Sequence, residues 1–105
     1  FSTKRMRDPG GIDDIIRACE AIGEKVEEHL VAYGDRYEDR LTGGHETAHF
    51  TEFTYGVSDR TASIRLPRSV HEDGCGYLED RRPNANADPY KIAARILRTV
   101  CNISD

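Results

Sequence analysis

Apolar residues recur at three- and four-residue steps between residues 12 and 33, which is the spacing of one buried helix face. Gly23 lies inside this stripe, where glycine lowers helix stability by about 1 kcal/mol relative to alanine. The pattern therefore predicts a helix over residues 12–33 with a kink at Gly23. The stripe consists of Ile12, Ile15, Ile16, Cys19, Ile22, Val26, Leu30 and Tyr33.

The period changes to two in the second half of the chain. Apolar residues alternate over residues 61–66, as they do in a strand with one buried face. Residues 50–57 are rich in Thr, Phe and Tyr and predict a short strand, or a turn leading to one. A second strand is expected over residues 77–82, after a turn at residues 74–76. Residues 34–44 are charged and aperiodic and indicate a loop.

A further helix is expected to begin at Asp88-Pro89, because Asp is a preferred N-cap and Pro is favoured at the first helical position. Its buried stripe is predicted to contain Ile92, Ile96, Leu97 and Val100. These elements together indicate an α+β fold, in which two main helices cover a small antiparallel sheet. A chain of 105 residues has room for one domain at most.

Composition narrows the classes of function. The hydrophobic share is 37% and the mean hydropathy is -0.68, so we expect other segments or subunits to contribute to stability. The net charge of -4 argues against non-specific nucleic-acid binding. No apolar run approaches the roughly 18 residues that cross a bilayer, and no signal peptide is evident. The chain opens with Phe1 instead of Met, as an internal fragment does.

Cysteine usage points to a reducing compartment. Cys19, Cys75 and Cys101 are odd in number, widely spaced and without a CxxC motif. We therefore expect free thiols in a cytosolic protein, and not a disulfide framework.

The expected strand over residues 77–82 carries the most informative polar pattern. Its period places Tyr77, Glu79 and Arg81 on one face. An aromatic ring, a carboxylate and a guanidinium suit an aromatic base, a hard metal ion and an anion, respectively. The alternative is a solvated face with a cross-strand ion pair that contributes little.

Arginine dominates the positive charges, with 12 Arg among the 15 Lys and Arg residues. Because guanidinium groups bind carboxylates and phosphates bidentately, a cluster of them would form an anion pocket. The alternative is a set of scattered surface charges. The six candidates between residues 40 and 82 are Arg40, Arg60, Arg65, Arg68, Arg81 and Arg82.

Residues 45–49 read His-Glu-Thr-Ala-His and match HExxH, the motif of zinc peptidases. The motif requires a helix that brings His45 and His49 to one face. The preceding Leu-Thr-Gly-Gly is a poor start for a helix, and a third ligand is not evident, although His71 or Glu72 can be nominated. A zinc peptidase therefore stays an alternative that depends on structural context. The remaining histidine, His29, lies near the apolar stripe and is expected to be structural.

Four segments, taken together, resemble glutamine synthetase, most closely the type II enzymes of eukaryotes and some bacteria. They occur in the family's order and extend over nearly the whole chain. They are Phe-Ser-Thr-Lys at 1–4, Arg-Leu-Thr-Gly-Gly-His-Glu-Thr at 40–47, Gly-Val-Ser-Asp-Arg-Thr-Ala-Ser-Ile-Arg at 56–65, and Gly-Tyr-Leu-Glu-Asp-Arg-Arg-Pro-Asn-Ala-Asn-Ala-Asp-Pro at 76–89. The resemblance implies that residues 1–105 are the C-terminal portion of the catalytic domain. The N-terminal β-grasp domain and the upstream catalytic half would then be absent.

The resemblance also implies roles for residues that bind ATP and its metal. Glu79 resembles a ligand of the divalent metal, Mg²⁺ or Mn²⁺, that holds the ATP phosphates. Tyr77, Leu78 and Glu79 resemble a nucleotide-binding segment. Arg60 and Arg65 match arginines that contact ATP phosphates. Ser58-Asp59-Arg60 replaces the more common Ala-Asn-Arg, which is a mild departure.

Other positions match residues that act on glutamate and ammonia. Arg40 and Arg60 match binders of glutamate, and Arg81 matches the arginine that contacts its side-chain carboxylate and the transferring phosphoryl group. Glu46 matches a flap glutamate that shields the intermediate and helps to deprotonate ammonia. The catalytic candidates are therefore Glu46 and Arg81.

The implied function is a ligase of glutamine biosynthesis and nitrogen metabolism. It joins ammonia to glutamate at the expense of ATP through γ-glutamyl phosphate, in a cytoplasmic homo-oligomer that the family implies to be a decamer. The family's other metal ligands would lie upstream of Phe1, so we expect this chain alone to be inactive. The alternative is a non-catalytic homologue that keeps the scaffold for binding or regulation.

Overall fold

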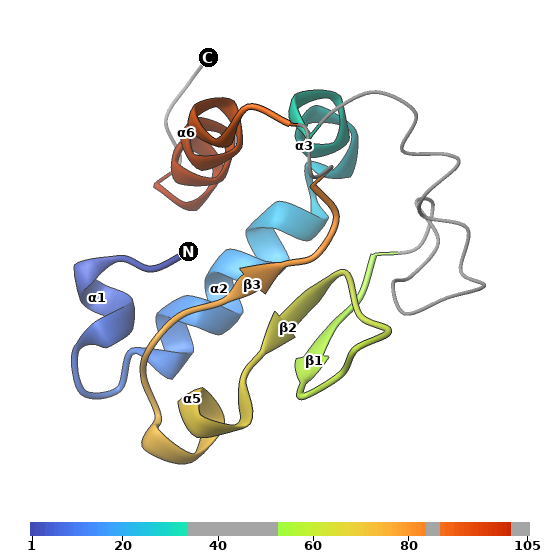
Figure 1. Ribbon diagram of the computed structural model, residues 1–105. Helices are drawn as coiled ribbons and strands as arrows, with labels where there is room; N and C mark the ends of the chain where they lie inside the picture. The colour runs from blue at the N-terminus through green and yellow to red at the C-terminus, as the bar shows by residue number, and fades with distance from the viewer. Residues whose placement is uncertain (34–52, 84–86, 102–105) are drawn as a thin grey trace.

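Helices and short strands interleave along the chain, and the α+β class predicted from the sequence is confirmed. The structure is a computed structural model that describes residues 1–33, 53–83 and 87–101. Within these ranges it contains five helices and three strands (Figure 1). In chain order they are α1 (Lys4–Arg7), α2 (Ile12–Gly23), α3 (Val26–Ala32), β1 (Tyr55–Val57), β2 (Ile64–Leu66), α5 (Arg68–Asp73), β3 (Glu79–Asp80) and α6 (Pro89–Val100).

The expected kink at Gly23 is confirmed as a break between two helices. Helix α2 ends at Gly23, and α3 begins at Val26. A Cβ atom at position 23 would lie 2.7 Å from the aromatic ring of Phe53, which is too close for a real contact. Glycine at this position therefore lets the Phe53 ring pack directly against the helix end.

The three strands form one sheet in the order β1-β2-β3. Strands β2 and β3 are antiparallel, with Arg65 opposite Glu79. Strands β1 and β2 are parallel, with Tyr55 opposite Ile64, so the sheet is mixed and not purely antiparallel as the sequence had indicated.

The loop over residues 58–63 explains the parallel pairing. It folds back along β1, so that β2 begins beside the first residue of β1 and runs in the same direction. The Ser58 N–H donates to the Leu66 carbonyl at 2.8 Å, and the Asp59 carboxylate accepts from the Thr61 N–H at 2.8 Å. Ser58 has a φ of 54°, in the left-handed region that non-glycine residues adopt infrequently. No two-residue hairpin signal separates the strands, and this is why the pairing direction was not evident from the sequence.

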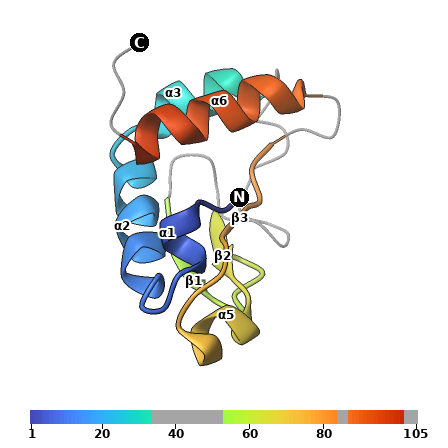
Figure 2. The same ribbon diagram turned by 90° about the vertical axis from the view of Figure 1, so that its left-hand side faces the viewer.

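The core lies between the sheet and α2. Ile64 and Leu66 of β2, with Leu78 just before β3, pack in one buried cluster with Ile15 and Ile22 of α2. Figure 1 shows α3 and α6 at one end of this arrangement and α5 at the other, and Figure 2 shows α6 running alongside α3. The same cluster includes Ile96 of α6, so the two main helices and the sheet share one core, as predicted.

Helix α6 begins where the sequence predicted, at Pro89. The Asp88 carboxylate caps it by accepting from the Tyr90 N–H at 2.9 Å. Its predicted stripe is wrong in one member, because Leu97 is 45% exposed. Arg95 and Thr99 are buried instead, since α6 turns a polar side toward α3.

The three cysteines are free thiols, as predicted: Cys19 is buried, Cys75 is half-buried and Cys101 is exposed. Burial, assisted by the negative charge of Asp80, raises the pKa of Cys19 to about 12, so this thiol is unreactive. Among the described helices, none is both long and apolar enough to cross a membrane.

Candidate active site

Residues 77–82 have two faces, as the period of two predicted. Tyr77 is 43% exposed, and Glu79 and Arg81 are partly exposed. Leu78 is fully buried and Arg82 is 2% exposed on the other face. The three residues nominated for base, metal and anion binding therefore share the outer face of this segment.

The pairing of β2 with β3 brings further candidates to the same area. Arg65 lies directly opposite Glu79, and the Arg81 N–H donates to the Ser63 carbonyl at 2.9 Å. The Arg81 guanidinium donates to the main-chain carbonyl of Arg60. Arg65 therefore lies opposite Glu79, and the Arg81 guanidinium contacts the main chain of Arg60.

One nitrogen among these arginines lacks a partner in the described part of the chain. The Nε atom of Arg65 is buried and has no hydrogen-bond partner within the described ranges. A buried donor without an acceptor is costly, so this nitrogen calls for an acceptor from outside the described ranges, and an anion is one group that would supply it.

Arg60 lies in a structured turn whose main chain contacts Arg81. Asp59 accepts hydrogen bonds from both the N–H of Thr61, at 2.8 Å, and its hydroxyl, at 2.6 Å. These hydrogen bonds hold the pKa of Asp59 below its usual value. The turn therefore has a defined shape even though Arg60 itself is exposed.

Two other arginines do not join these residues, which corrects the hypothesis of a single pocket. Arg68 lies on α5 and forms an ion pair with Glu72, with 3.2 Å between its Nε and the carboxylate. Arg82 points into the interior and pairs with Asp80. The period of two explains the second case, because it places residues 78, 80 and 82 on the buried face.

Several predicted residues lie outside the described residues. They include Arg40, Glu46 and both histidines of the HExxH match, so the helix that a zinc site requires is not tested. Of the nominated third ligands, His71 is exposed on α5 and Glu72 pairs with Arg68.

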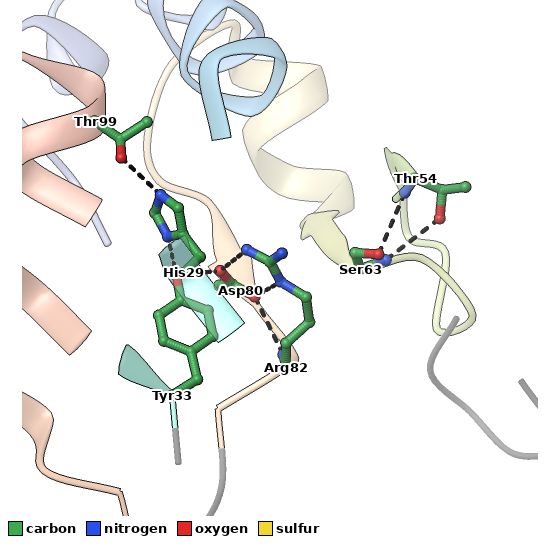
Figure 3. Close-up of polar contacts among 7 residues, drawn as sticks. All are labelled: His29, Tyr33, Thr54, Ser63, Asp80, Arg82 and Thr99. Carbon is green, nitrogen blue, oxygen red and sulfur yellow. Dashed lines mark hydrogen bonds and ion pairs between the residues drawn. The ribbon is translucent and has the colours of Figure 1, made fainter. Parts of the chain in front are cut away.

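A buried polar network connects the inner face of β3 to the helices (Figure 3). His29 contacts the Tyr33 hydroxyl through Nδ1 at 2.7 Å and the Thr99 hydroxyl through Nε2 at 2.7 Å. The Tyr33 hydroxyl donates to Asp80 at 2.6 Å, and Arg82 donates to the same carboxylate at 2.8 and 2.9 Å. The expectation that His29 is structural is confirmed. The rest of the network was missed, although the i,i+4 spacing of His29 and Tyr33 on an apolar stripe was a signal for it.

Charge and burial fix the protonation of this network. Burial, together with the nearby positive charge of Arg82, lowers the pKa of His29 to about 4. Burial and the Asp80 carboxylate raise the pKa of Tyr33. Burial opposes the charge on Arg82, but its hydrogen bonds and attraction to Asp80 outweigh this and raise its pKa. At neutral pH the network therefore contains a neutral imidazole, a neutral phenol and one ion pair.

Two grooves on the surface of the described residues differ in their relation to the candidate site. One of about 470 Å³ lies beside β3 and includes Tyr77, Glu79 and, from α6, Ile92 and Ile96 among its lining. The other, of about 670 Å³, lies between α1, α2 and the end of α6 and contains none of the predicted site residues. The first groove is therefore the one that adjoins the candidate site.

Glu79 is the candidate metal ligand on this outer face. Glu79 offers one carboxylate on the outer face, but within residues 1–33, 53–83 and 87–101 no three His, Cys, Asp or Glu side chains converge to hold an ion. The described residues alone do not make a metal site, and any ion at Glu79 needs ligands from elsewhere.

No protein-family model matches the chain. Curated relatives are nonetheless similar along almost its whole length. A protein named glutamine synthetase from Streptomyces viridochromogenes is 53% identical over 104 residues, which cover 97% of this chain and 30% of the relative. A glutamine synthetase from Saccharomyces cerevisiae is 49% identical, covering 99% of the chain and 28% of the relative. A glutamine synthetase cytosolic isozyme from Medicago sativa is 50% identical, covering 94% and 28%, respectively. The chain is thus homologous, at about 50% identity, to proteins named glutamine synthetase, and it spans about 30% of their length.

Proposed function

We propose that this chain is the C-terminal portion of the catalytic domain of a type II glutamine synthetase. The parent enzyme would join ammonia to glutamate in an ATP-dependent reaction. The observation that carries the proposal is the identity of about half the residues along nearly the entire chain. The pairing of Arg65 with Glu79 and the contact of Arg81 with the main chain of Arg60 support it, since they bring these candidate residues from two segments into one area.

In the proposed reaction, ATP first phosphorylates the γ-carboxylate of glutamate. Arg60 and Arg65 would contact the ATP phosphates, and Arg81 would contact the glutamate carboxylate as the phosphoryl group arrives. Negative charge on the phosphoryl oxygens is stabilised by fixed positive charges, and a cluster of guanidinium groups supplies them. The buried Nε of Arg65 is suited to this role because it has no acceptor in the described part of the chain.

Ammonia then displaces phosphate from the acyl phosphate to give glutamine. This step requires the exclusion of water, which would otherwise hydrolyse the intermediate. Glu46 is proposed to deprotonate the attacking ammonia from a flap that covers the site, and Arg40 to bind the main-chain carboxylate of glutamate. The roles of Glu46 and Arg40 rest on the resemblance alone, because both residues lie outside the described ranges.

The nucleotide and metal would meet at β3. Tyr77 offers an exposed aromatic ring next to the groove, and Leu78 anchors the segment in the core. Glu79 would contribute one oxygen ligand to a Mg²⁺ or Mn²⁺ ion. The other ligands are proposed to come from the remaining part of the longer protein, which assembles as a cytoplasmic homo-oligomer.

Calorimetric titration of the purified chain with ADP tests the phosphate site. We expect measurable binding that weakens at least tenfold in Arg65→Ala, because one charge-assisted bidentate contact is lost. Arg68→Ala is the matched control, since Arg68 is an exposed arginine three residues away that pairs with Glu72. Equal affinity for ADP in the wild type and Arg65→Ala, or loss only in Arg68→Ala, would place the phosphates elsewhere and contradict the assignment.

The isolated chain is expected to synthesise no glutamine. The described residues supply one candidate metal ligand, and the chain spans about 30% of its relatives. Incubation with glutamate, ammonia, ATP and Mg²⁺, followed by chromatographic detection of glutamine, measures this directly. Turnover above that of a Glu79→Ala, Arg81→Ala double variant would contradict the expectation.

A further inference from the structure

The buried network behind the candidate site forms a continuous chain of hydrogen bonds across three elements. It runs from Thr99 on α6 through His29 on α3 and Tyr33, at the end of α3, to Asp80 on β3 (Figure 3). Arg95 adds a donor at one end, with Nη2 3.4 Å from the Thr99 hydroxyl. The Thr99 hydroxyl, the His29 imidazole and the Tyr33 hydroxyl can each donate in either direction along this row of hydrogen bonds. The Arg95 guanidinium can only donate, and the Asp80 carboxylate only accepts.

The two ends of this chain fix its direction. Asp80, paired with Arg82, is a carboxylate and can only accept, so the Tyr33 hydroxyl donates to it. The Tyr33 oxygen then accepts from His29, which requires hydrogen on Nδ1. A neutral His29 has its lone pair on Nε2, and this atom accepts from the Thr99 hydroxyl. The arrangement permits one tautomer of His29, and removal of any link leaves a buried group without its partner.

The anchored carboxylate is adjacent to the site. Asp80 lies opposite Ile64 in the sheet, and its neighbour Glu79 lies opposite Arg65 with its side chain on the other face. Because successive side chains of a strand alternate in direction, fixing Asp80 also fixes how Glu79 and Arg81 project.

We propose that Tyr33 and His29 are positioning residues, which hold Asp80 through this directional chain so that Glu79 and Arg81 project toward the ligand. The identity of the ligand as a nucleotide rests on the proposed function. The positioning itself rests on the hydrogen bonds alone. The charged and titratable groups that face His29 are Asp80 and Arg82 from the β3 segment, Arg95 from α6, and Glu28 and Tyr33 from its own helix segment.

Nitrogen-15 NMR of the complete 105-residue chain reads out the tautomer and the site together. We expect the wild-type His29 ring to carry its hydrogen on Nδ1. In Tyr33→Phe the acceptor is lost, so the hydrogen moves to Nε2 and bonds to Thr99. The backbone amide signals of Glu79 and Arg81 are expected to shift or broaden, and affinity for ADP to fall about fivefold. Ile15→Val is the control, since it weakens the same core without touching the network.

Thr99→Val is the second variant. It removes the hydrogen bond between His29 and Thr99, which is the one farthest from β3. It is therefore expected to disturb the Glu79 and Arg81 amides less than Tyr33→Phe does. If Tyr33→Phe does not fold, Thr99→Val tests the positioning role by itself. The role then requires that Thr99→Val shift the Glu79 and Arg81 amides more than Ile15→Val does.

The outcomes separate this inference from the proposed function. Hydrogen on Nε2 in the wild type, or unchanged Glu79 and Arg81 amides in the folded variants, overturns the positioning role. Absence of ADP binding in the wild type, together with the expected tautomer and amide shifts, contradicts the nucleotide assignment and supports the positioning role. Amide shifts of equal size in Ile15→Val would show that the network is merely part of the core.

Discussion

The two faces of the β3 segment carry the same kinds of charged side chain in opposite circumstances. On the inner face, the side chains of Asp80 and Arg82 are each 3% exposed and lie 2.8 Å apart. The Arg82 guanidinium also lies over the rings of Tyr33 and Phe53, at 5.1 and 5.2 Å from their centroids. On the outer face, Glu79 and Arg81 are partly open to solvent.

Within a few consecutive residues, the inner side chains therefore serve the stability of the fold and the outer side chains are available for binding. A buried ion pair gives little net stability relative to apolar side chains, but loss of one partner leaves an uncompensated charge inside the protein. The inner pair therefore fixes the orientation of the strand. The outer charges are hydrated before a ligand binds, so they are available to it at small cost to the fold.

Asp80→Ala is expected to have the largest effect on stability. It leaves Arg82 buried without its carboxylate and removes the acceptor of the Tyr33 hydroxyl. We expect a loss of about 3–5 kcal/mol in the free energy of unfolding, measured by urea denaturation. Asp73→Ala, at an exposed position on α5, is the matched control and should change the value by less than about 0.5 kcal/mol. A loss below about 1 kcal/mol in Asp80→Ala would show that the inner pair is dispensable.

The second prediction concerns pH. The pKa of His29 is lowered from 6.5 to about 4 in the folded chain, so the unfolded chain binds a proton first as pH falls. His29 therefore contributes stability that is complete above pH 6.5 and is lost as pH falls through about 4. The loss should reach roughly 3 kcal/mol, because a tenfold difference in proton affinity corresponds to about 1.4 kcal/mol.

Urea denaturation between pH 7 and pH 3.5 measures this contribution, with His29→Gln for comparison. Acidic residues contribute to the pH dependence of both proteins, so the difference between the two curves isolates the imidazole. Parallel curves across this range would mean that the His29 pKa is not lowered by folding.

The sequence predicted the two main helical segments and the outer face, because both depend on local periodicity. It did not predict α1 or α5, and β2 and β3 are shorter than the strands expected over residues 61–66 and 77–82. The start of α6 followed from Asp88 and Pro89, and the break after α2 followed from Gly23. The sharing of one face by Tyr77, Glu79 and Arg81 followed from the period of two. These features require knowledge of only the nearest neighbours in the chain.

The sequence did not predict features that depend on partners distant along the chain. The parallel pairing of β1 with β2 depends on how the loop over residues 58–63 folds. The burial of Arg82 depends on Asp80, Tyr33 and Phe53 together, and charge alone suggested an exposed anion binder. The exposure of Leu97 has the same origin, since Thr99 takes the inward position to meet His29.

A third, smaller effect is expected for Gly23→Ala. The new methyl group would favour the helix by about 1 kcal/mol, but it would lie 2.7 Å from the Phe53 ring. Overpacking costs about 1–3 kcal/mol, so we expect a net loss of about 1 kcal/mol in the free energy of unfolding. Displacement of the Phe53 ring would also move the ring away from the Arg82 guanidinium. Position 23 is therefore coupled to the inner face of the β3 segment. The double variant with Phe53→Leu should lose less than the sum of the single variants, and strict additivity would argue against the clash.

The smallest effect on stability is expected for Glu79→Gln, which tests the outer face. Glu79 is partly exposed, so neutralising it should change the free energy of unfolding by less than about 0.5 kcal/mol. The same substitution should weaken the enhancement of ADP binding by Mg²⁺, because an amide oxygen is a poorer ligand for a hard cation than a carboxylate. Calorimetric titrations with and without Mg²⁺ measure this, with Glu72→Gln on α5 as the control. If Glu79→Gln destabilised the chain as strongly as Asp80→Ala, the two faces would not differ in function, and Glu79 would be part of the scaffold instead of the site.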